Sequence, residues 1–170
     1  MNQKLIIPLS VCLGFLISCS GSLPTEPNLH DFWSNRVIEN KNINALYQAS
    51  SYLSVYSEIY SNNEKTTHNL TVTLSMRNTS SIDTVFILSA NYFNTEGHLI
   101  KSYFDHPIYI LPLETAELVV TEKGGTGGNF IFDWATENSK LEPIFEAVMI
   151  STSGQQGISF VTQGIKRTSE

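Results

Sequence analysis

Hydrophobic and polar residues alternate along several segments of the chain, which is the pattern of a half-buried β-strand. In residues 68–78 four apolar side chains alternate with polar ones: Leu70, Val72, Leu74 and Met76. The same alternation occurs in residues 51–60 and in residues 114–122. These three segments are therefore predicted to be strands that place one face in the core.

The middle of the chain predicts a central strand followed by a hairpin. Residues 83–93 form a nearly continuous apolar run with β-branched and aromatic side chains, which suits a buried strand. A turn at 94–97 ends on Gly97, a residue that adopts a positive φ easily, and 99–104 is predicted to be the returning strand. Proline lacks the backbone N–H that a strand pair needs, so Pro107 and Pro112 predict an edge or a loop at 107–113.

The C-terminal third predicts further strands at 129–136 and 157–165. Residues 142–151 leave two interpretations open, because the apolar spacing also fits a helix. A strand is preferred, since the segment is short and ends in Val-Met-Ile before a glycine turn. Residues 123–128 are rich in glycine, but no Gly-Lys-Ser/Thr follows, so they are predicted to be a mobile hairpin loop rather than a phosphate-binding loop.

About eight short strands joined by turns either pack as two antiparallel sheets or close into a barrel. We favour an all-β fold, an immunoglobulin-like antiparallel β-sandwich of about eight strands. The Cys–Trp–Cys pattern of true immunoglobulin domains is absent, because the two cysteines of the chain are Cys12 and Cys19. The predicted domain therefore has neither an internal disulfide nor a thiolate metal site.

The N-terminus predicts export. The apolar stretch from Leu5 to Ile17 follows Lys4 and is shorter than the roughly 20 residues that span a bilayer as a helix. It ends in Leu16-Ile17-Ser18-Cys19, which resembles the lipobox of bacterial lipoproteins. The resemblance implies cleavage before Cys19 and lipidation of its sulfur. The alternatives are an ordinary cleaved signal with a chance cysteine, or an uncleaved apolar N-terminus.

This interpretation divides the chain into four parts. Residues 1–18 would be the signal peptide, 19–50 the lipidated cysteine and a tether with a candidate short helix, 51–166 the β-sandwich domain, and 167–170 a tail. The expected location is the bacterial cell envelope, with membrane lipid contacted through acylated Cys19. Ser20, in place of an aspartate, favours the outer membrane facing the periplasm over the inner membrane if the cell is Gram-negative.

The charge composition of the chain excludes one class of binding partner. The formal net charge is −6, and the ten Lys and Arg residues are scattered apart from Lys166-Arg167. Nucleic-acid binding needs a positive footprint that replaces the counterions of the phosphates, so nucleic acid is excluded as a partner. Hydrophobic residues make up 41% of the chain, which is enough for a packed core.

Several short segments resemble one protein family. They are Tyr52–Ser57, Leu74–Thr79, Gly127–Phe130 and Glu146–Ile150 running into Thr152–Phe160. Together they resemble the DUF3124 family, bacterial proteins of unknown function that are often exported, over roughly residues 51–162. The resemblance supports the extent of the domain and implies no activity, substrate or catalytic residue.

Candidate catalytic groups are few. His30, His68, His98 and His106 lack the spacing of familiar metal motifs, although His98 and His106 flank one predicted strand beside Asp105. Ser153-Gly154 lacks the full Gly-x-Ser-x-Gly elbow of serine hydrolases. Asp133 would form a carboxylate pair only if folding brought Glu142 or Glu146 near it. We therefore assign no catalytic residue, no metal and no cofactor, and predict that the protein is not an enzyme.

The Gly154-Gln155-Gln156-Gly157 segment is the most distinctive candidate for binding. Turn chemistry alone explains it as a hairpin, but paired amides also donate and accept hydrogen bonds to a peptide or a glycan. The candidate binding residues are Gln155, Gln156, Ser153 and Asn129. Although most aromatic side chains at strand positions belong to a core, strand aromatics would add stacking surface: Tyr52, Tyr56, Tyr60, Tyr92, Tyr103 and Trp134.

Three functions remain open at this point. The first is a membrane-anchored envelope lipoprotein with a non-enzymatic role in binding a protein or supporting an assembly. The second is a glycan- or small-ligand-binding module with an aromatic and amide face. The third, less favoured, is an enzyme with an unrecognised site.

Overall fold

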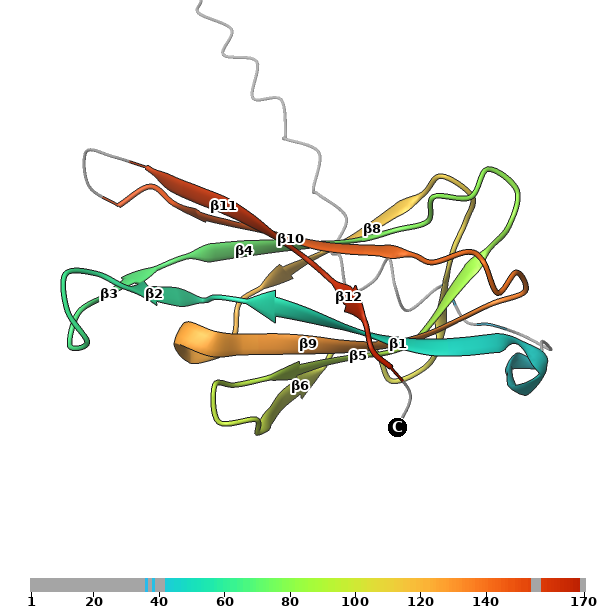
Figure 1. The fold of residues 1–170 in the computed structure, drawn as a ribbon, viewed down its shortest axis with the longest axis horizontal. Helices are drawn as coiled ribbons and strands as arrows, with labels where there is room; N and C mark the ends of the chain where they lie inside the picture. The colour runs from blue at the N-terminus through green and yellow to red at the C-terminus, as the bar shows by residue number, and fades with distance from the viewer. Residues whose placement is uncertain (1–35, 37, 39–41, 154–156, 169–170) are drawn as a thin grey trace, which may run out of the picture.

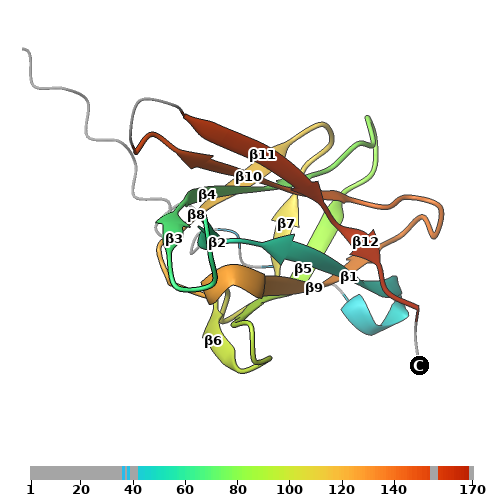
Figure 2. The same cartoon turned by 60° about the vertical axis from the view of Figure 1, so that its left-hand side comes forward.

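Two antiparallel sheets face each other in the computed structural model, which describes residues 36, 38, 42–153 and 157–168 (Figures 1 and 2). The predicted all-β antiparallel β-sandwich is confirmed, with twelve strands in the described residues where about eight are expected. The predicted signal peptide, Cys19, Gln155 and Gln156 lie outside the described residues. No helix in the described part of the chain has the length and apolarity to cross a bilayer.

One sheet, here called sheet I, has the strand order β12-β1-β9-β5-β6, and β7 also pairs with β5. Its strands are β1 (Tyr47–Val55), β5 (Val85–Phe93), β6 (Leu99–Ser102), β7 (Ile108–Ile110), β9 (Gly128–Thr136) and β12 (Ile165–Lys166). Sheet II has the order β11-β10-β4-β8. Its strands are β4 (Thr71–Arg77), β8 (Thr115–Val120), β10 (Ile144–Ser151) and β11 (Ile158–Gln163). In Figure 1 sheet II is the upper layer and sheet I the lower layer.

Two small elements complete the described chain. Strands β2 (Glu58–Tyr60) and β3 (Thr67–Asn69) form a separate two-stranded ribbon. A 3₁₀ turn, η1 (Ile43–Ala45), precedes β1. Strand β1 thus begins at Tyr47, within the segment expected to be a tether, whereas the predicted domain began at residue 51.

The core lies between the two sheets and follows the predicted alternation. Val72, Leu74 and Met76 of β4 are fully buried, and Leu70 just before them is 9% exposed. A row of stacked aromatic rings crosses the interior from sheet I to sheet II. Its centroid separations are 4.7 Å for Tyr92–Phe130, 5.5 Å for Phe130–Phe132 and 4.2 Å for Phe132–Phe145. Offset aromatic contacts add to the hydrophobic gain, so this row ties β5, β9 and β10 together.

Most of the predicted strands are confirmed. β5 is central in sheet I, β10 is a strand rather than a helix, and Gly97 has φ +80° in the turn between β5 and β6. The segment between Pro107 and Pro112 contributes only the short strand β7, which pairs with one half of β5. Proline at both ends explains why that pairing stops after three residues.

The prediction of a mobile hairpin at 123–128 is wrong. This segment passes from β8 in sheet II to β9 in sheet I and contains the 3₁₀ turn η2 (Gly125–Gly127). Thr95 Oγ1 accepts a hydrogen bond from Gly127 N at 3.0 Å and donates one to Gly124 O at 3.2 Å. Gly124 is required for packing, because a Cβ there would lie 2.1 Å from Tyr92 Oη. The glycines therefore allow a close approach between the turn and the β5 end.

The predicted final strand at 157–165 divides between the two sheets. β11 pairs with β10, and after Gly164 the chain crosses to pair with β1 as β12. Gly164 N donates to Phe145 O at 2.8 Å, and a Cβ on Gly164 would lie 3.0 Å from Phe145 Cβ. One continuous segment thus joins the layers at this corner (Figure 2).

Candidate functional site

Arg36 is bound to the turn between β7 and β8. Its Nη1 donates to Glu114 Oε2 at 2.7 Å and to Tyr109 O at 3.0 Å, and its Nη2 contacts Glu114 Oε1. The guanidinium carbon lies 5.4 Å from the centre of the Tyr109 ring. The two charged side chains are 11% and 24% exposed. A bidentate pair of this kind is among the stronger polar contacts in proteins, so it defines where the chain joins the sandwich.

The electrostatics of this pair keep both partners ionised. The hydrogen bond with Glu114 raises the pKa of Arg36 against the opposing effect of burial. The hydrogen bond from Arg36 lowers the pKa of Glu114, with help from Leu111 N–H, which donates to Glu114 Oε2 at 2.8 Å. Glu114 is therefore a charged acceptor fixed by both a side chain and the backbone.

Asn78 supports the turn that carries Glu114. This residue is 3% exposed, and its Nδ2 donates to Ile110 O at 3.1 Å, to Leu111 O at 3.0 Å and to Asp83 O at 2.8 Å. The turn contains the one positive-φ residue other than glycine in the described part of the chain, Leu113 at φ 59°. Asn78 thus fixes a turn whose backbone is otherwise unfavourable for leucine.

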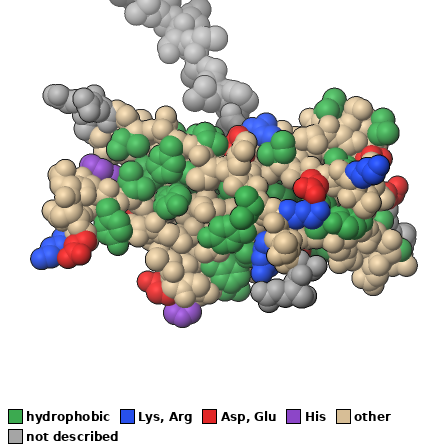
Figure 3. Space-filling view, viewed as in Figure 1, with side chains coloured by type: hydrophobic (Ala, Val, Ile, Leu, Met, Phe, Trp, Pro, Cys, Tyr) green, Lys and Arg blue, Asp and Glu red, His purple; other side chains and the backbone are tan. Residues whose placement is uncertain are grey.

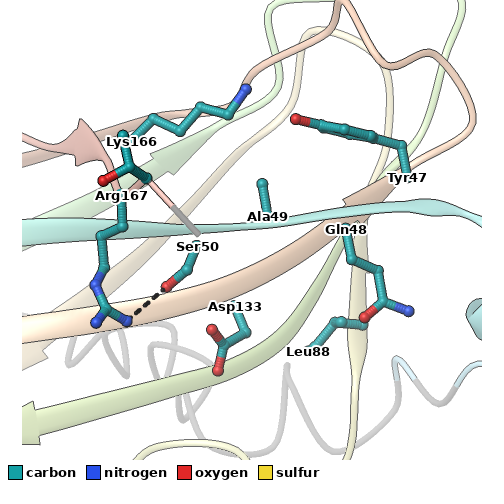
Figure 4. Close-up of a pocket in the computed structure, with 9 residues that line it drawn as sticks. Tyr47, Gln48, Ala49, Ser50, Leu88, Asp133, Lys166 and Arg167 are labelled. Carbon is teal, nitrogen blue, oxygen red and sulfur yellow. Dashed lines mark hydrogen bonds between the residues drawn. The ribbon is translucent and has the colours of Figure 1, made fainter. Parts of the chain in front are cut away.

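A cavity of about 760 Å³ lies beside β1 in sheet I (Figure 4). Its lining residues are Tyr47, Gln48, Ala49, Ser50, Leu88, Asp133, Lys166, Arg167 and Thr168. Leu88 is an extra residue in the β5–β9 pairing, because Ile87 pairs with Trp134 and Ser89 with Asp133. Such bulges bend a strand and redirect side chains, which fits a hollow at this place.

The polar groups of this cavity lie on two sides of β1. Figure 4 shows Asp133, Ser50 and the Arg167 guanidinium on one side, and Tyr47 and Lys166 on the other. Asp133 Oδ2 accepts a hydrogen bond from Ser89 Oγ at 2.8 Å, and Arg167 Nη1 donates to Ser50 Oγ at 3.4 Å. The carboxylate can accept further hydrogen bonds and the guanidinium can donate them, so the cavity suits a small polar molecule.

A second charged cluster connects β6 of sheet I with the residues that follow β8 of sheet II. Glu122 accepts hydrogen bonds from Lys101 Nζ and Tyr103 Oη, each at 2.6 Å. Burial opposes ionisation of Glu122, but these two hydrogen bonds outweigh it and lower its pKa to about 2. Burial, followed by the bond to Glu122, raises the pKa of Tyr103. Glu122 therefore fixes the side chains of Lys101 and Tyr103, and the role of this cluster is structural.

The sequence-predicted binding residues lie in different parts of the fold. Ser153 follows β10 of sheet II and lines a smaller cavity of about 210 Å³ beside Leu70 and Ile150. Asn129 lies in β9 of sheet I, where it pairs with Ser54 and Phe93.

The predicted aromatic face is wrong for two of its six members. Tyr92 is 0% exposed and Trp134 is 1% exposed, so both rings belong to the core. Tyr56 packs edge to face against Phe160 at 5.9 Å, whereas Tyr60 is 60% exposed. A row of six stacking rings is therefore absent from the described surface.

Two of the carboxylates considered for acid–base chemistry, Asp133 and Glu146, are separated. Asp133 and Glu146 lie on the outer faces of opposite sheets, because the neighbours of each along the strand are buried. Glu146 is 3.6 Å from Arg77, and Glu142 accepts a hydrogen bond from Lys166 at 2.5 Å. His106 pairs with Asp105 at 2.5 Å, while His98 N donates to Asn94 Oδ1 in the β5–β6 turn. Among the described residues, no three metal-binding side chains converge.

The comparisons with known proteins give a family and one similar crystal structure. The family model described as "Protein of unknown function (DUF3124)" matches residues 48–166. No curated protein matches the chain. A crystal structure of Thermotoga maritima 1070 superposes with a TM-score of 0.43 at 11% sequence identity, over 69% of this chain and 92% of that one.

Proposed function

The chain belongs to the DUF3124 family, and we propose that it is a lipid-anchored envelope protein whose β-sandwich binds a protein partner or supports an assembly without catalysing a reaction. The observation that carries this proposal is Leu16-Ile17-Ser18-Cys19 at the end of a short apolar stretch. Acylation of Cys19 would supply the lipid chains, and two or more chains give stable anchoring at ~0.8 kcal/mol per buried CH₂.

The Arg36–Glu114 pair supports a role close to the membrane. Residues 20–35 lie between Cys19 and Arg36, and an extended chain from one to the other reaches at most roughly 60 Å. Because Arg36 is bound to the sandwich, this contour length limits how far the domain can move from an anchored Cys19. The expected location is the outer membrane facing the periplasm if the cell is Gram-negative, since Ser20 stands where aspartate would favour the inner membrane.

The hydrogen bonds of two partly buried carboxylates, Glu114 and Glu122, support a non-catalytic role. Glu114 is bound to Arg36, Glu122 to Lys101 and Tyr103, and the side chains of each cluster connect segments distant in sequence. A catalytic acid or base needs a lone pair or proton directed at a substrate. These carboxylates instead direct their oxygens at their own protein.

Incorporation of labelled fatty acid into the full chain tests the anchor. We expect wild-type protein to carry label from radioactive palmitate, and Cys19→Ser to carry none. Cys12→Ser is the matched control, because it removes the other cysteine of the chain and should keep the label. Absence of label in the wild type, or its persistence in Cys19→Ser, would contradict the proposal.

A second candidate function rests on the cavity beside Asp133. A volume of about 760 Å³ with a carboxylate and a guanidinium fits a small sugar-like ligand that both donates and accepts hydrogen bonds. A ligand that binds only the folded state raises the melting temperature. We expect this rise with a bound sugar to be lost in Asp133→Asn and kept in Glu96→Gln, a change in the β5–β6 turn. No rise with any sugar of a broad panel would eliminate this function.

A further inference from the structure

Most edge strands of this sandwich carry a feature that prevents pairing with another chain. β6 contains Lys101, β7 lies between Pro107 and Pro112, and β8 contains Glu117. Charged residues and prolines at an edge are the usual means by which β-proteins avoid edge-to-edge association. β11 is different, because residues 157–165 contain no Asp, Glu, Lys, Arg or Pro.

β11 is paired with another strand on one side only in the described part of the chain. It pairs with β10 over Ile158–Gln163, and within the described chain no strand pairs with its other edge. Phe160 packs against Tyr56, and Thr162 Oγ1 donates to Ser54 O at 2.7 Å. The unpaired edge is therefore a preformed template for a further strand, with little ordering entropy left to lose on binding.

One row of side chains on the outer surface next to this edge is uncharged, although Glu146 lies beside Gln163 in the adjacent row. The strand registers align Val161 of β11 with Val148, Thr73 and Val119 across sheet II. Val161 is 54% exposed and Val119, at the other end of the row, is 44% exposed. Figure 3 shows hydrophobic side chains along the edge of the sandwich between sheet II above and sheet I below, which is a different face from this row. The row has no charge that would oppose a neighbouring sheet.

We propose that β11 pairs antiparallel with β11 of a second copy of this chain, around a two-fold axis at Val161. In a two-fold contact the strand pairs with the same strand of the other copy. A charged side chain on it would therefore lie near the identical charge of the partner strand and be repelled. The uncharged β11 avoids this repulsion, although the whole chain carries a net charge of −6. A second copy is thus the occupant that the charge pattern favours.

The register of this pairing is self-complementary. With the axis at Val161, the two Val161 side chains meet on the outer face, and Ser159 lies opposite Gln163 of the other copy. On the inner face Phe160 lies opposite Thr162. The methyl groups bury one another, and the serine hydroxyl and glutamine amide can hydrogen-bond. The result is one continuous sheet made of β8, β4, β10 and β11 from each copy. The pairing stands on β11 alone and does not depend on lipidation of Cys19.

A cysteine at the proposed axis tests this contact directly. Residues opposite each other in antiparallel strands have Cα atoms about 4.5–5.5 Å apart, which a disulfide spans. We expect Val161→Cys in the full chain, oxidised in detergent solution, to give a disulfide-linked dimer on a non-reducing gel. Val119→Cys is the matched control, because it lies on the same face at the opposite edge of the sheet, and it should give no more dimer than wild type.

Sedimentation of the full chain in density-matched detergent provides the second readout. Val161→Lys places two like charges at the axis and should reduce the protein mass from two chains to one, whereas Val119→Lys should leave two. A monomeric wild type, an unchanged mass in Val161→Lys, or a Val161→Cys disulfide to a different protein would each overturn the proposal. The last outcome would identify β11 as a site for a foreign strand.

Discussion

Arg36 and Glu114 form a bidentate ion pair although 78 positions separate them in the sequence. The pair lies at the turn between β7 and β8, where Tyr109 and Leu111 add backbone and ring contacts. It therefore determines where the segment from the N-terminus joins the sandwich. If Cys19 is acylated, this pair also sets the length of chain between the bilayer and the domain.

Replacing Arg36 tests how much this junction contributes. We expect Arg36→Ala to lower the free energy of unfolding by about 1–3 kcal/mol, because Glu114 loses its charged donor in a partly buried place. Arg77→Ala is the control, since Arg77 is 43% exposed and 3.6 Å from Glu146, and it should cost only about 0.2–1 kcal/mol. Urea unfolding followed by tryptophan fluorescence measures both. Equal losses of unfolding free energy in the two variants would show that the Arg36–Glu114 pair contributes no more than an exposed ion pair.

The Glu122 cluster predicts a specific loss of stability in acid. The folded-state pKa of about 2 lies below the unfolded value near 4.3, so this group stabilises the fold above about pH 5. The contribution is lost as the pH falls through the folded pKa. We expect Glu122→Gln to be less stable than wild type at neutral pH and the difference to shrink as the pH falls from about 4.5 to 2.

Unfolding measured across that pH range checks this expectation. Glu96→Gln, in the β5–β6 turn, is the control and should run parallel to wild type. A difference between Glu122→Gln and wild type that stays constant down to the lowest pH would mean that the Lys101 and Tyr103 hydrogen bonds do not depress the Glu122 pKa.

The tight turn between the two sheets predicts a large effect from one methyl group. A Cβ at Gly124 would lie 2.1 Å from Tyr92 Oη, and Tyr92 is fully buried, so the ring has to move within the core. We expect Gly124→Ala to destabilise the protein by about 1–3 kcal/mol, the usual cost of overpacking. Gly157→Ala meets only ordinary contact, 3.6 Å from Ser151 O, and should be near neutral in thermal unfolding. A neutral Gly124→Ala would show that the turn is loose.

Alternation along the chain was sufficient to predict the strands that have one buried face. Leu74 and Met76 of β4, and Ala116 and Leu118 of β8, face the core as expected because the period of two fixes the face of every side chain. The preference for a strand at 142–151 was also correct, since β10 lies between β4 and β11 and a strand is needed there.

Contacts between distant segments were beyond sequence reasoning. Nothing near Arg36 marks Glu114 as its partner, because their meeting depends on where β7 and β8 lie in the folded sheets. The assignment of β11 and β12 to different sheets depends likewise on Gly164 packing against Phe145. The sequence marks Asp133 only as an acidic residue. The cavity that it lines also contains Leu88, the extra residue in the β5–β9 pairing, and that pairing cannot be derived from spacing.

The mass of the N-terminal peptide of the mature protein tests the central claim most directly. Proteolysis of the membrane-extracted full chain followed by mass spectrometry should yield a peptide that begins at Cys19 and carries a diacylglycerol thioether. A peptide that contains residues before Cys19, or one with an unmodified Cys19 sulfur, would contradict the account.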